Sequence, residues 1–551
     1  MPNSWRSEEE PRKSRSSLSP VNCSGSEPAG RRECAIMEMS LPYLLRRAAF
    51  KFPDKEAIVS ETGRWTYRRW DCSSNKRAWA LKKCGVRKGD HVATLFLNGN
   101  EVLETYLAVM KLGAVVVPLN VRLSSGELNY IVNHSDASTV IFSHEFLKTV
   151  SSMKPSCPAV KQWIVSGAES PEGFRSLDEL LQDESDEDPF IPIAERDIAC
   201  ILYTAGTTGK PKGVLLSHRN CIWAAASAAS DVDYKPEYRV ALVFPLYHAA
   251  AFGIFVTNLY LGCTHVTMKQ FDPQKVMEMI FRERINRIVF PPTVWNFILQ
   301  LPDIDRFDTS SVRSLGSGAE TMPLQTKKRL LNLFPNASLG ETYGMTETVA
   351  TISTLKPADV LRKLASVGRP FVNMEIRIAD GENEDLPPGE LGEILVRGPN
   401  VMEGYYKDPD AGAEALKGGW LHTGDLGKLD EEGFLFIVDR KKDMIISGGE
   451  NIYPKEIEEV LYTHPKILEA AVIGVPDALW GEKVHAVVAL KDGETLTEDQ
   501  VIDYCKARIA GFKKPKSVEF VQRLPRSPAG KVLKSVLREQ WAKSTSGRHE
   551  S

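Results

Sequence analysis

Short apolar runs alternate with amphipathic helical segments over residues 41–438. Residues 91–96 form a short, mostly apolar run typical of a buried strand. Residues 101–112 repeat their apolar positions at helical spacing, and residues 114–118 are typical of a further strand. Strands that alternate with helices in this way build βαβ units around a largely parallel sheet. We therefore predict a large α/β domain over this part of the chain.

The pattern changes twice toward the C-terminus. Residues 375–379 and 392–396 alternate apolar and polar side chains between Gly and Pro, which predicts a small antiparallel, barrel-like β section. Beyond Asp443 we predict a small α+β domain, with strands at 467–475, 483–490 and 517–521 and helices at 454–463 and 498–509. The predicted boundaries are 37–439 for the large domain, 440–442 for the junction and 443–543 for the small domain.

The two ends of the chain and two internal stretches differ in composition from the rest of the predicted domains. Residues 1–36 lack an apolar run and are predicted to be a disordered extension, with Met37 as an alternative start, and residues 544–551 are a featureless tail. The acidic run 183–188 is predicted to be a solvated linker. Residues 241–268 carry no charge but are interrupted by Pro245, Gly253 and Gly262, which favours a buried strand, turn and helix over a membrane span.

Composition narrows the class of protein. A chain of 551 residues predicts about two to four structural units, and 42% apolar with 26% charged residues is typical of a soluble globular protein. A net charge of -3 gives no reason to expect nucleic acid or an anionic membrane as a partner. The nine cysteines show no zinc-binding spacing, and no targeting signal is present, so we predict reduced thiols in a cytoplasmic protein.

Residues 203–213 (YTAGTTGKPKG) are the most informative stretch. Glycines let backbone N–H groups approach phosphate oxygens, threonines add donors and lysines neutralise charge, so the composition suits a polyphosphate. The spacing is not that of a Walker loop, because Gly206 precedes Gly209 by only three positions and Pro211 stands in the Ser/Thr place. The residues before and after this stretch are predicted to form two strands, and a helix is predicted to begin near Ser217.

Together with five later motifs, this loop resembles the phosphate-binding signature of the adenylate-forming superfamily, and most closely its acyl-CoA synthetase branch. Most members carry Ser where this chain has Ala205. The resemblance implies that the loop binds ATP and that Thr204 also contributes to a magnesium site. The ATP-binding loop residues carried over by position are Thr204, Gly206, Thr207, Thr208, Gly209 and Lys210.

Further nucleotide-binding residues follow from the resemblance. Residues 315–320 (LGSGAE) match a glycine-rich wall beside adenine; a dinucleotide fingerprint is excluded because Thr321 occupies the place of its last glycine. In residues 340–347 (GETYGMTE), Tyr343 would stack on adenine, Thr346 would bond the α-phosphate and Glu347 would hold Mg²⁺. Asp425 and Arg440 would bind ribose. The remaining residues carried over as ATP-binding are Gly318, Ala319, Glu320, Glu341, Thr342, Gly344 and Met345.

The same resemblance assigns a hinge, a thiol path and a catalytic lysine. Lys442 matches the hinge about which a mobile small domain rotates. Ser447, Gly448 and Gly449 match a loop along the path of the CoA thiol. Lys531 matches the lysine that bridges the substrate carboxylate and the α-phosphate, so the predicted catalytic residues are Lys531, Glu347 and Thr346.

Residues 244–253 match the segment that lines the acyl pocket in relatives. The predicted lining residues are His248, Ala249, Phe252, Gly253 and Thr293. Amino-acid-activating relatives place an aspartate in this segment and none is present here, so the resemblance implies a hydrophobic acid without an α-amine, whether fatty, alicyclic or aromatic. Such an enzyme joins the acid to CoA with ATP and Mg²⁺.

Three alternatives to a CoA ligase stay open from sequence. They are an adenylation enzyme that loads a separate acyl carrier protein, a luciferase-like oxygenase, and a nucleotide-binding regulatory protein with a degenerate site, suggested by Ala205. The sequence does not distinguish a monomer from a homodimer.

Overall fold

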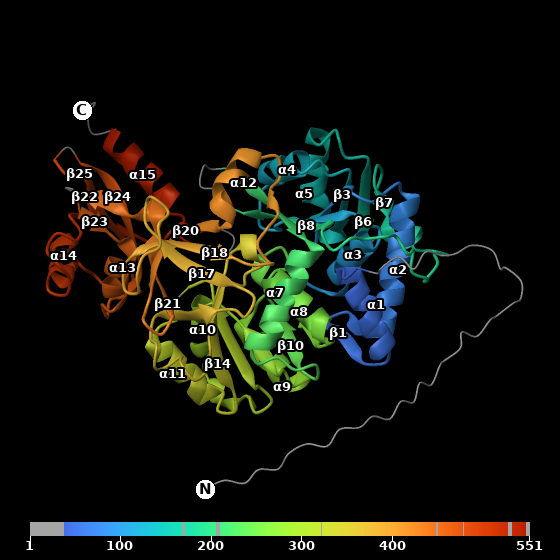
Figure 1. Ribbon diagram of the computed structural model, residues 1–551, viewed down its shortest axis with the longest axis horizontal. Coiled ribbons are helices and arrows are strands. Elements are labelled where there is room, and N and C mark those ends of the chain that lie inside the picture. Colours follow the sequence, from blue (N-terminus) through green and yellow to red (C-terminus); the bar gives the residue numbers. More distant parts are fainter. Residues whose placement is uncertain are drawn as a thin grey trace, which may run out of the picture. The chain divides into compact units, whose positions relative to one another are not determined.

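A computed structural model describes residues 38–167, 171–204, 210–320, 322–447, 450–477, 479–526 and 532–546. Figure 1 traces the elements in sequence colours. The predicted N-terminal extension lies outside these ranges. The first described element is α1 (Leu41–Lys51). The Ser40 side chain caps it by accepting the Tyr43 N–H, and Pro42 occupies the first turn.

One sheet carries the first βαβ units. Its strands lie in the order β19-β9-β8-β4-β3-β5-β6-β7, and every neighbouring pair from β8 to β7 is parallel. β9 runs antiparallel to both β8 and β19. The strands are β3 (His91–Leu95), β4 (Val115–Pro118), β5 (Thr139–Ser143), β6 (Gln162–Ser166), β7 (Arg175–Ser176), β8 (Ile198–Thr204), β9 (Lys212–Ser217) and β19 (Gly404–Tyr405). The predicted parallel sheet is confirmed.

A second sheet has the strand order β17-β18-β20-β21-β16-β15-β14-β13-β12-β10-β11-β1-β2. The run from β14 to β1 is parallel, and the pairs from β14 to β17 are antiparallel. The predicted antiparallel section is therefore confirmed, but it extends the parallel sheet and is not a separate barrel. The strands are β1 (Glu56–Ser60), β2 (Gly63–Thr66), β10 (Arg239–Leu242), β11 (Thr264–Thr267), β12 (Arg287–Val289), β13 (Ser314–Gly318), β14 (Ser338–Tyr343), β15 (Ser353–Leu355), β16 (Ser366–Pro370), β17 (Glu375–Ala379), β18 (Gly392–Arg397), β20 (Leu421–Leu429) and β21 (Leu435–Arg440).

Helices cover both faces of these sheets. One buried cluster joins Val92 of the first sheet, Phe255 of α8 and Leu242 of the second sheet, while separate clusters join Ile131 of α4 to the first sheet and Ile280 of α9 to the second. The helices are α2 (Tyr67–Lys83), α3 (Asn100–Lys111), α4 (Ser125–His134), α5 (Leu147–Met153), α6 (Leu177–Leu180), α7 (His218–Asp231), α8 (Ala249–Leu261), α9 (Pro273–Glu283), α10 (Pro292–Leu299), α11 (Leu324–Leu333) and α12 (Pro409–Ala415). Short 3-10 helices are η1 (His144–Phe146), η2 (Lys154–Ser156), η3 (Ile304–Arg306), η4 (Thr346–Thr348), η5 (Lys417–Gly419) and η6 (Lys441–Asp443).

The C-terminal part has its own sheet and core, as predicted. β24 and β25 form a long antiparallel pair, β26 pairs parallel with β25, and Val472 and Val488 pack with Ile457 of α13. The elements are β22 (Ile445–Ser447), β23 (Glu450–Ile452), α13 (Pro454–Tyr462), β24 (Ile467–Asp477), β25 (Gly481–Leu490), α14 (Glu498–Lys506), β26 (Ser517–Val521) and α15 (Lys534–Ser546).

The uncharged segment 241–268 forms the end of β10, then α8 and β11, as predicted. α8 ends at Gly262, whose φ of 80° is the left-handed conformation that glycine adopts without strain. Among the described residues, no helix combines the length and the apolar character that a membrane span requires.

The acidic run 183–188 is a connection with four exposed residues, as predicted, but two of its carboxylates also dock it onto the neighbouring helices. Asp188 accepts a 2.9 Å hydrogen bond from Lys111 Nζ, and the Lys111 side chain has no exposed surface. Glu184 is 6% exposed and pairs with Lys83, while Asn75 donates to the Asp186 carbonyl oxygen. A buried ammonium requires a partner, so the run is docked against α2 and α3.

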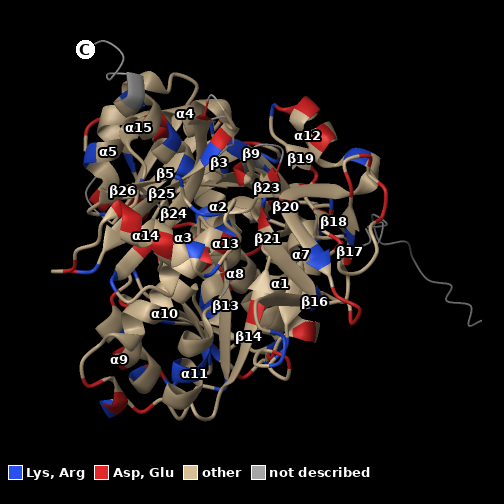
Figure 2. Ribbon diagram, turned by 90° about the vertical axis from the view of Figure 1, so that its left-hand side faces the viewer, with Lys and Arg blue, Asp and Glu red and all other residues tan. Residues whose placement is uncertain are grey.

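Charges of both signs are interspersed along the described ribbon (Figure 2). Many pair locally, as Arg397 and Glu375 do at 2.6 Å. The seven cysteines among the described residues are free thiols, and six of them are buried.

Candidate active site

The predicted phosphate loop connects two strands of the first sheet. β8 and β9 pair antiparallel with Thr204 opposite Lys212, so the strand–loop–strand arrangement matches the prediction. A Cβ at Gly213 would lie 2.8 Å from Ile201 Cγ2, which explains a glycine at the base of this hairpin. Thr204 is half-buried and Lys210 is exposed. The loop residues Ala205, Gly206, Thr207, Thr208 and Gly209 lie outside the described residues.

Glu347 follows β14 directly, in η4. Gly344 is required at the turn, because a Cβ there would lie 2.1 Å from the Ala350 carbonyl carbon. The chain reverses at Val349 and Ala350, whose φ angles are 51° and 59°. Glu347 is 7% exposed and Thr346 is half-buried. Thr346 and Glu347 therefore lie beyond the carboxyl end of a parallel strand, where α/β folds place ligands.

Tyr405, which the sequence analysis missed, connects this turn to the loop hairpin. Its hydroxyl donates a 2.8 Å hydrogen bond to Glu347 Oε1, and Lys212 Nζ lies 4.9 Å from the centre of its ring. Burial and the neighbouring Glu347 carboxylate raise the pKa of Tyr405, so it stays a protonated donor. The only sequence signal was an ordinary Gly404–Tyr405 pair, whose place beside β9 follows from the sheet pairing.

Three residues from three separate motifs meet at one point. Tyr343 Oη donates to Asp425 Oδ2 at 2.6 Å, and Arg440 Nε lies 3.3 Å from Asp425 Oδ1. β20 and β21 place Asp425 opposite Arg440. Tyr343 and Asp425 are 9% and 7% exposed. Burial and the Asp425 carboxylate raise the pKa of Tyr343, so the pair consists of a neutral phenol and a carboxylate.

The glycine-rich wall lies beside these residues. β13 and β14 are parallel with Gly318 opposite Thr342, and a Cβ on Gly318 would lie 2.9 Å from the Thr342 oxygen. Ala319 adopts a φ of 70°, which turns the chain away from the strand. Glu320 is exposed and accepts a long hydrogen bond of 3.4 Å from Thr293. Met345 is half-buried and its N–H donates to Thr348 Oγ1.

Glu341 forms an ion pair with Lys327, a second residue that the sequence analysis missed. Its carboxylate pairs with Lys327 of α11 and accepts the Met322 N–H at 3.2 Å. Both members of the pair are buried. The ion pair thus fastens the chain beyond Gly318 to β14. Lys327 lies on an otherwise ordinary helix, so no pattern marked it.

Four of the five predicted acyl residues lie at the start of α8, and Thr293 lies in the first turn of α10. His248 is its N-cap residue, half-buried, with its ring 4.6 Å from that of Tyr247. Gly253 packs so closely that a Cβ would lie 3.0 Å from the Val349 oxygen. Ala249 is buried. Phe252 has no exposed surface and packs against Tyr106 and Phe255, so its ring belongs to the core between the sheets.

The predicted hinge follows β21. Lys441 Nζ lies 3.0 Å from Glu393 Oε2, and the other oxygen of Glu393 accepts the Gly424 N–H beside Asp425 at 3.3 Å. Ser447 ends β22, opposite Glu450. The Lys442 side chain, Gly448, Gly449 and Lys531 lie outside the described part of the chain.

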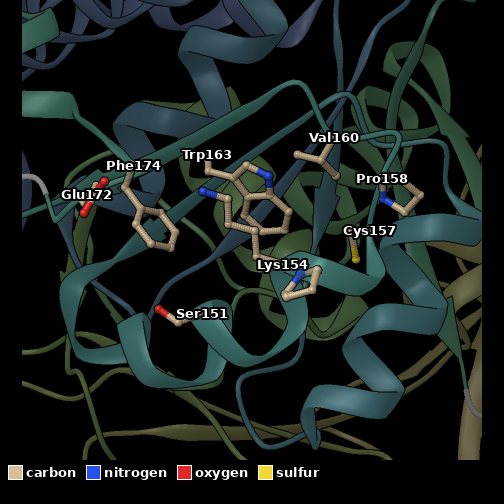
Figure 3. A pocket seen from close by; sticks show the side chains of 9 residues that line it. Ser151, Lys154, Cys157, Pro158, Val160, Trp163, Glu172 and Phe174 are labelled. Carbon is tan, nitrogen blue, oxygen red and sulfur yellow. The ribbon is translucent and has the colours of Figure 1, made fainter.

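A depression on the first sheet lies apart from all predicted site residues. It measures about 570 Å³ and is lined by Ser151, Lys154, Pro155, Cys157, Pro158, Val160, Trp163, Glu172 and Phe174. Figure 3 shows Lys154 extended across Trp163, and its Nζ lies 4.4 Å from the centre of the Phe174 ring. The lysine thus occupies the aromatic surface itself.

Comparison with known proteins identifies the family. The AMP-binding enzyme model matches residues 45–406, and the AMP-binding enzyme C-terminal domain model matches residues 456–531. The chain belongs to the AMP-binding enzyme family. It is a member of the acyl-CoA synthetase branch of the adenylate-forming superfamily, whose members are AMP-forming acid–CoA ligases.

Relatives within the AMP-binding enzyme family match nearly the whole chain. Feruloyl-CoA synthase of Amycolatopsis sp. is 39% identical, covering 90% of this chain and 98% of its own length. A long-chain-fatty-acid–CoA ligase of Mycobacterium tuberculosis is 35% identical, covering 91% and 99%. The solved structure of the anthranilate CoA ligase AuaEII, in complex with anthranoyl-AMP, is 27% identical with a TM-score of 0.86, covering 93% of this chain and 98% of that one.

Proposed function

We propose that this acid–CoA ligase binds ATP against the Tyr343–Asp425–Arg440 cluster and uses it to activate a hydrophobic carboxylic acid. The observation that carries the proposal is the meeting of these three residues within hydrogen-bonding distance. An aromatic ring offers a face for adenine, and a carboxylate with two oxygens suits the two ribose hydroxyls. Arg440 pairs with the carboxylate and orients it.

In the first half-reaction the substrate carboxylate attacks the α-phosphorus of ATP. A new carboxyl oxygen–phosphorus bond forms, the bond to the bridging oxygen breaks, and pyrophosphate leaves with that electron pair. Charge develops on the α-phosphate and on pyrophosphate, so positioned donors and cations dominate the rate. We assign Thr346 and Lys531 to the α-phosphate, and the 204–210 loop with its threonines and Lys210 to the β- and γ-phosphates.

The residues present suit magnesium as a partner of ATP. No group of three or more His, Cys, Asp or Glu side chains among the described residues could hold a metal alone. Mg²⁺ bound to nucleotides needs only one or two carboxylates besides phosphate oxygens and water, and Glu347 supplies one, oriented by Tyr405. We assign Glu347, with Thr204 at the edge of the loop, to this ion, which would neutralise phosphate charge when bound.

In the second half-reaction the CoA thiolate attacks the acyl carbon of the adenylate, and AMP leaves. In this proposal, Lys531 leaves the site for the second half-reaction and the segment 447–449 approaches it. We propose that residues 443–543 rotate about Lys442 as a unit against residues 37–439. The ion pair of Lys441 with Glu393 lies directly before this hinge.

We propose that the acid carries an apolar ring or chain and no α-amine. The named relatives take a feruloyl, a long-chain fatty or an anthranilate acyl group. In this chain the start of α8 offers small apolar side chains, and no aspartate in residues 244–253 is available to receive an ammonium group. One methylene more or less in the acid changes the discrimination between substrates by only about 1–3 kcal/mol. Small differences in the side chains of the pocket wall therefore determine which acid is accepted.

A panel of acids tests the proposal. Purified protein with ATP, Mg²⁺ and CoA would be given aromatic, alicyclic and fatty acids of increasing length, with α-amino acids as controls, and AMP and acyl-CoA measured by mass spectrometry. We expect equal amounts of AMP and thioester from one or more hydrophobic acids and none from amino acids. Turnover with acyl carrier protein but not CoA would favour a carrier-loading enzyme, and no turnover with any acid would contradict the proposal.

A further inference from the structure

The turn that follows Glu347 has a strained backbone. Val349 and Ala350 have φ angles of 51° and 59°, a left-handed conformation that is unfavourable for residues other than glycine and most of all for a β-branched valine. Two such residues in succession persist only where their surroundings hold them in place. The turn is also closely packed, since a Cβ on Gly253 of α8 would lie 3.0 Å from the Val349 oxygen.

One buried side chain bonds both ends of this turn. Asn400 lies between β18 and β19 and has no exposed surface. Its amide N–H groups donate to the carbonyl oxygen of Thr348 at 2.9 Å and to that of Thr351 at 2.7 Å. These carbonyls stand immediately before and immediately after the two strained residues. Because only the nitrogen of an amide can face two carbonyl oxygens, the contacts also fix the orientation of the Asn400 side chain.

The segment that carries Asn400 is itself anchored to the candidate site. Asn220, in the first turn of α7, donates to the carbonyl oxygens of both chain neighbours of Asn400, at 3.0 and 2.7 Å. The Met402 N–H donates to the Glu347 carbonyl oxygen at 2.8 Å. Since α7 follows directly from β9, Asn400 connects the turn after Glu347 with the hairpin of the predicted phosphate loop.

We propose that Asn400 is a positioning residue that holds Thr346 and Glu347 in place for the phosphates of ATP and the magnesium ion. The inference rests on the roles proposed above for these two residues. Both belong to η4, and the last residue of η4, Thr348, accepts one of the Asn400 hydrogen bonds. Without these bonds the strained turn relaxes toward an ordinary backbone conformation, and η4 moves with it. Asn400 acts through this turn and is not assigned a contact with substrate.

The test is Asn400→Leu, which keeps a similar side-chain volume and removes both donors. Calorimetry measures the binding of ATP with Mg²⁺ and, separately, of adenosine, which lacks the phosphates. We expect the affinity for ATP with Mg²⁺ to fall about tenfold, as it does when a metal ligand loses a partner that orients it, and the affinity for adenosine to stay within about twofold. Pyrophosphate–ATP exchange should also require a higher Mg²⁺ concentration. A purely structural role would reduce the fraction of folded protein and leave both dissociation constants unchanged.

Asn286→Leu is the matched control. Asn286 also bonds the backbone at two points, because it donates to the Ser311 carbonyl oxygen at 3.1 Å and accepts the Arg239 N–H at 2.8 Å. It directly precedes β12, at the amino end of the parallel strands and therefore at the opposite end from the candidate site. This variant should lower the free energy of unfolding and change neither dissociation constant.

Ala350→Gly tests the strain itself. Glycine adopts the left-handed conformation without strain, so the double variant Asn400→Leu with Ala350→Gly should recover part of the lost affinity for ATP with Mg²⁺. Should Asn400→Leu fail to fold, Asn400→Ser keeps one donor and should show a smaller loss of the same kind. Equal losses of affinity for ATP and for adenosine, or no loss in either Asn400 variant, would overturn the inference.

Glu347→Gln, measured in parallel, separates this inference from the proposed function. If Glu347→Gln weakens the binding of ATP with Mg²⁺ while the Asn400 variants bind it as the parent does, only the positioning role is wrong. If Glu347→Gln itself binds ATP with Mg²⁺ as tightly as the parent, the assignment of Glu347 to the ion fails, and the inference about Asn400 fails with it.

Discussion

The Tyr343 hydroxyl donates a 2.6 Å hydrogen bond to Asp425, and this contact joins the side chain proposed to face adenine to the one proposed to bind ribose. The two residues are 82 positions apart in sequence and belong to β14 and β20 of the same sheet. A change at either residue should therefore affect recognition of the whole nucleoside.

Tyr343→Phe keeps the aromatic face and removes only the hydroxyl. Hydrogen bonds to charged groups contribute about 1.5–3 kcal/mol, so we expect the KM for ATP to rise by about tenfold to a hundredfold, with a smaller change in the KM for the acid. Tyr238→Phe is the control, because its hydroxyl also bonds an aspartate, Asp233, away from the site. An unchanged KM for ATP in Tyr343→Phe would contradict the assignment.

Lys327→Met should be strongly destabilising because it leaves the buried Glu341 carboxylate without its counter-ion. Breaking a buried pair costs about 3–5 kcal/mol, measurable by urea unfolding. The double variant Lys327→Met with Glu341→Gln should recover much of this loss, since the neutral amide oxygen still accepts the Met322 N–H. If the single and the double variant lose the same free energy of unfolding, then lost packing, and not the unpaired charge, explains the destabilisation.

Tyr405→Phe removes the donor that orients Glu347. We expect the Mg²⁺ concentration needed for half-maximal adenylate formation to rise several-fold, because the carboxylate loses a fixed direction. The neighbouring Tyr406 provides a matched control, since its hydroxyl donates to the exposed Asp136 at 2.8 Å. If Tyr406→Phe shifts the Mg²⁺ dependence as much as Tyr405→Phe does, the Tyr405–Glu347 contact is not responsible.

Acid should destabilise the fold through His218. Burial lowers the pKa of His218 to about 4 from its ordinary value of 6.5. Between these values the unfolded chain binds the proton and the folded one does not, so stability is full above pH 6.5 and falls as the pH drops toward 4, by up to about 1.4 kcal/mol per pH unit. His218 Nδ1 accepts the Leu41 N–H at the start of α1. Urea unfolding between pH 6.5 and 4.5 should show that the free energy of unfolding of His218→Gln depends less steeply on pH than that of the parent. An equally steep dependence in both proteins would show that His218 is not the cause.

Local sequence signals were sufficient for much of the fold and for single site residues. The hairpin around the phosphate loop followed from two apolar runs and an intervening Gly/Thr/Lys stretch, and Ser217 was the expected start of α7, which it caps with Asn220 in a reciprocal pair. Tyr343, Asp425 and Arg440 were assigned one motif at a time, each from its own short pattern.

What sequence reasoning missed are contacts between distant segments. Tyr405, Lys327 and Lys111 carry no local signature, since their importance lies in a partner brought near by sheet pairing or helix packing. The docking of the acidic run 183–188 was missed for the same reason, because charge patterning along a chain says nothing about a buried lysine on another helix. The antiparallel strands were found, but their continuity with the parallel sheet depends on the pairing of β15 with β14.

The central claim, attack of the acid on the α-phosphate of ATP, is tested most directly with an ¹⁸O-labelled carboxylic acid. Attack at the α-phosphorus makes a carboxyl oxygen the bridge of the adenylate, and cleavage by the CoA thiolate leaves that oxygen on AMP. Mass spectrometry of a completed reaction should therefore find one ¹⁸O in AMP for each thioester formed, and none in pyrophosphate. Label in pyrophosphate or inorganic phosphate, or unlabelled AMP beside labelled thioester, would contradict the account.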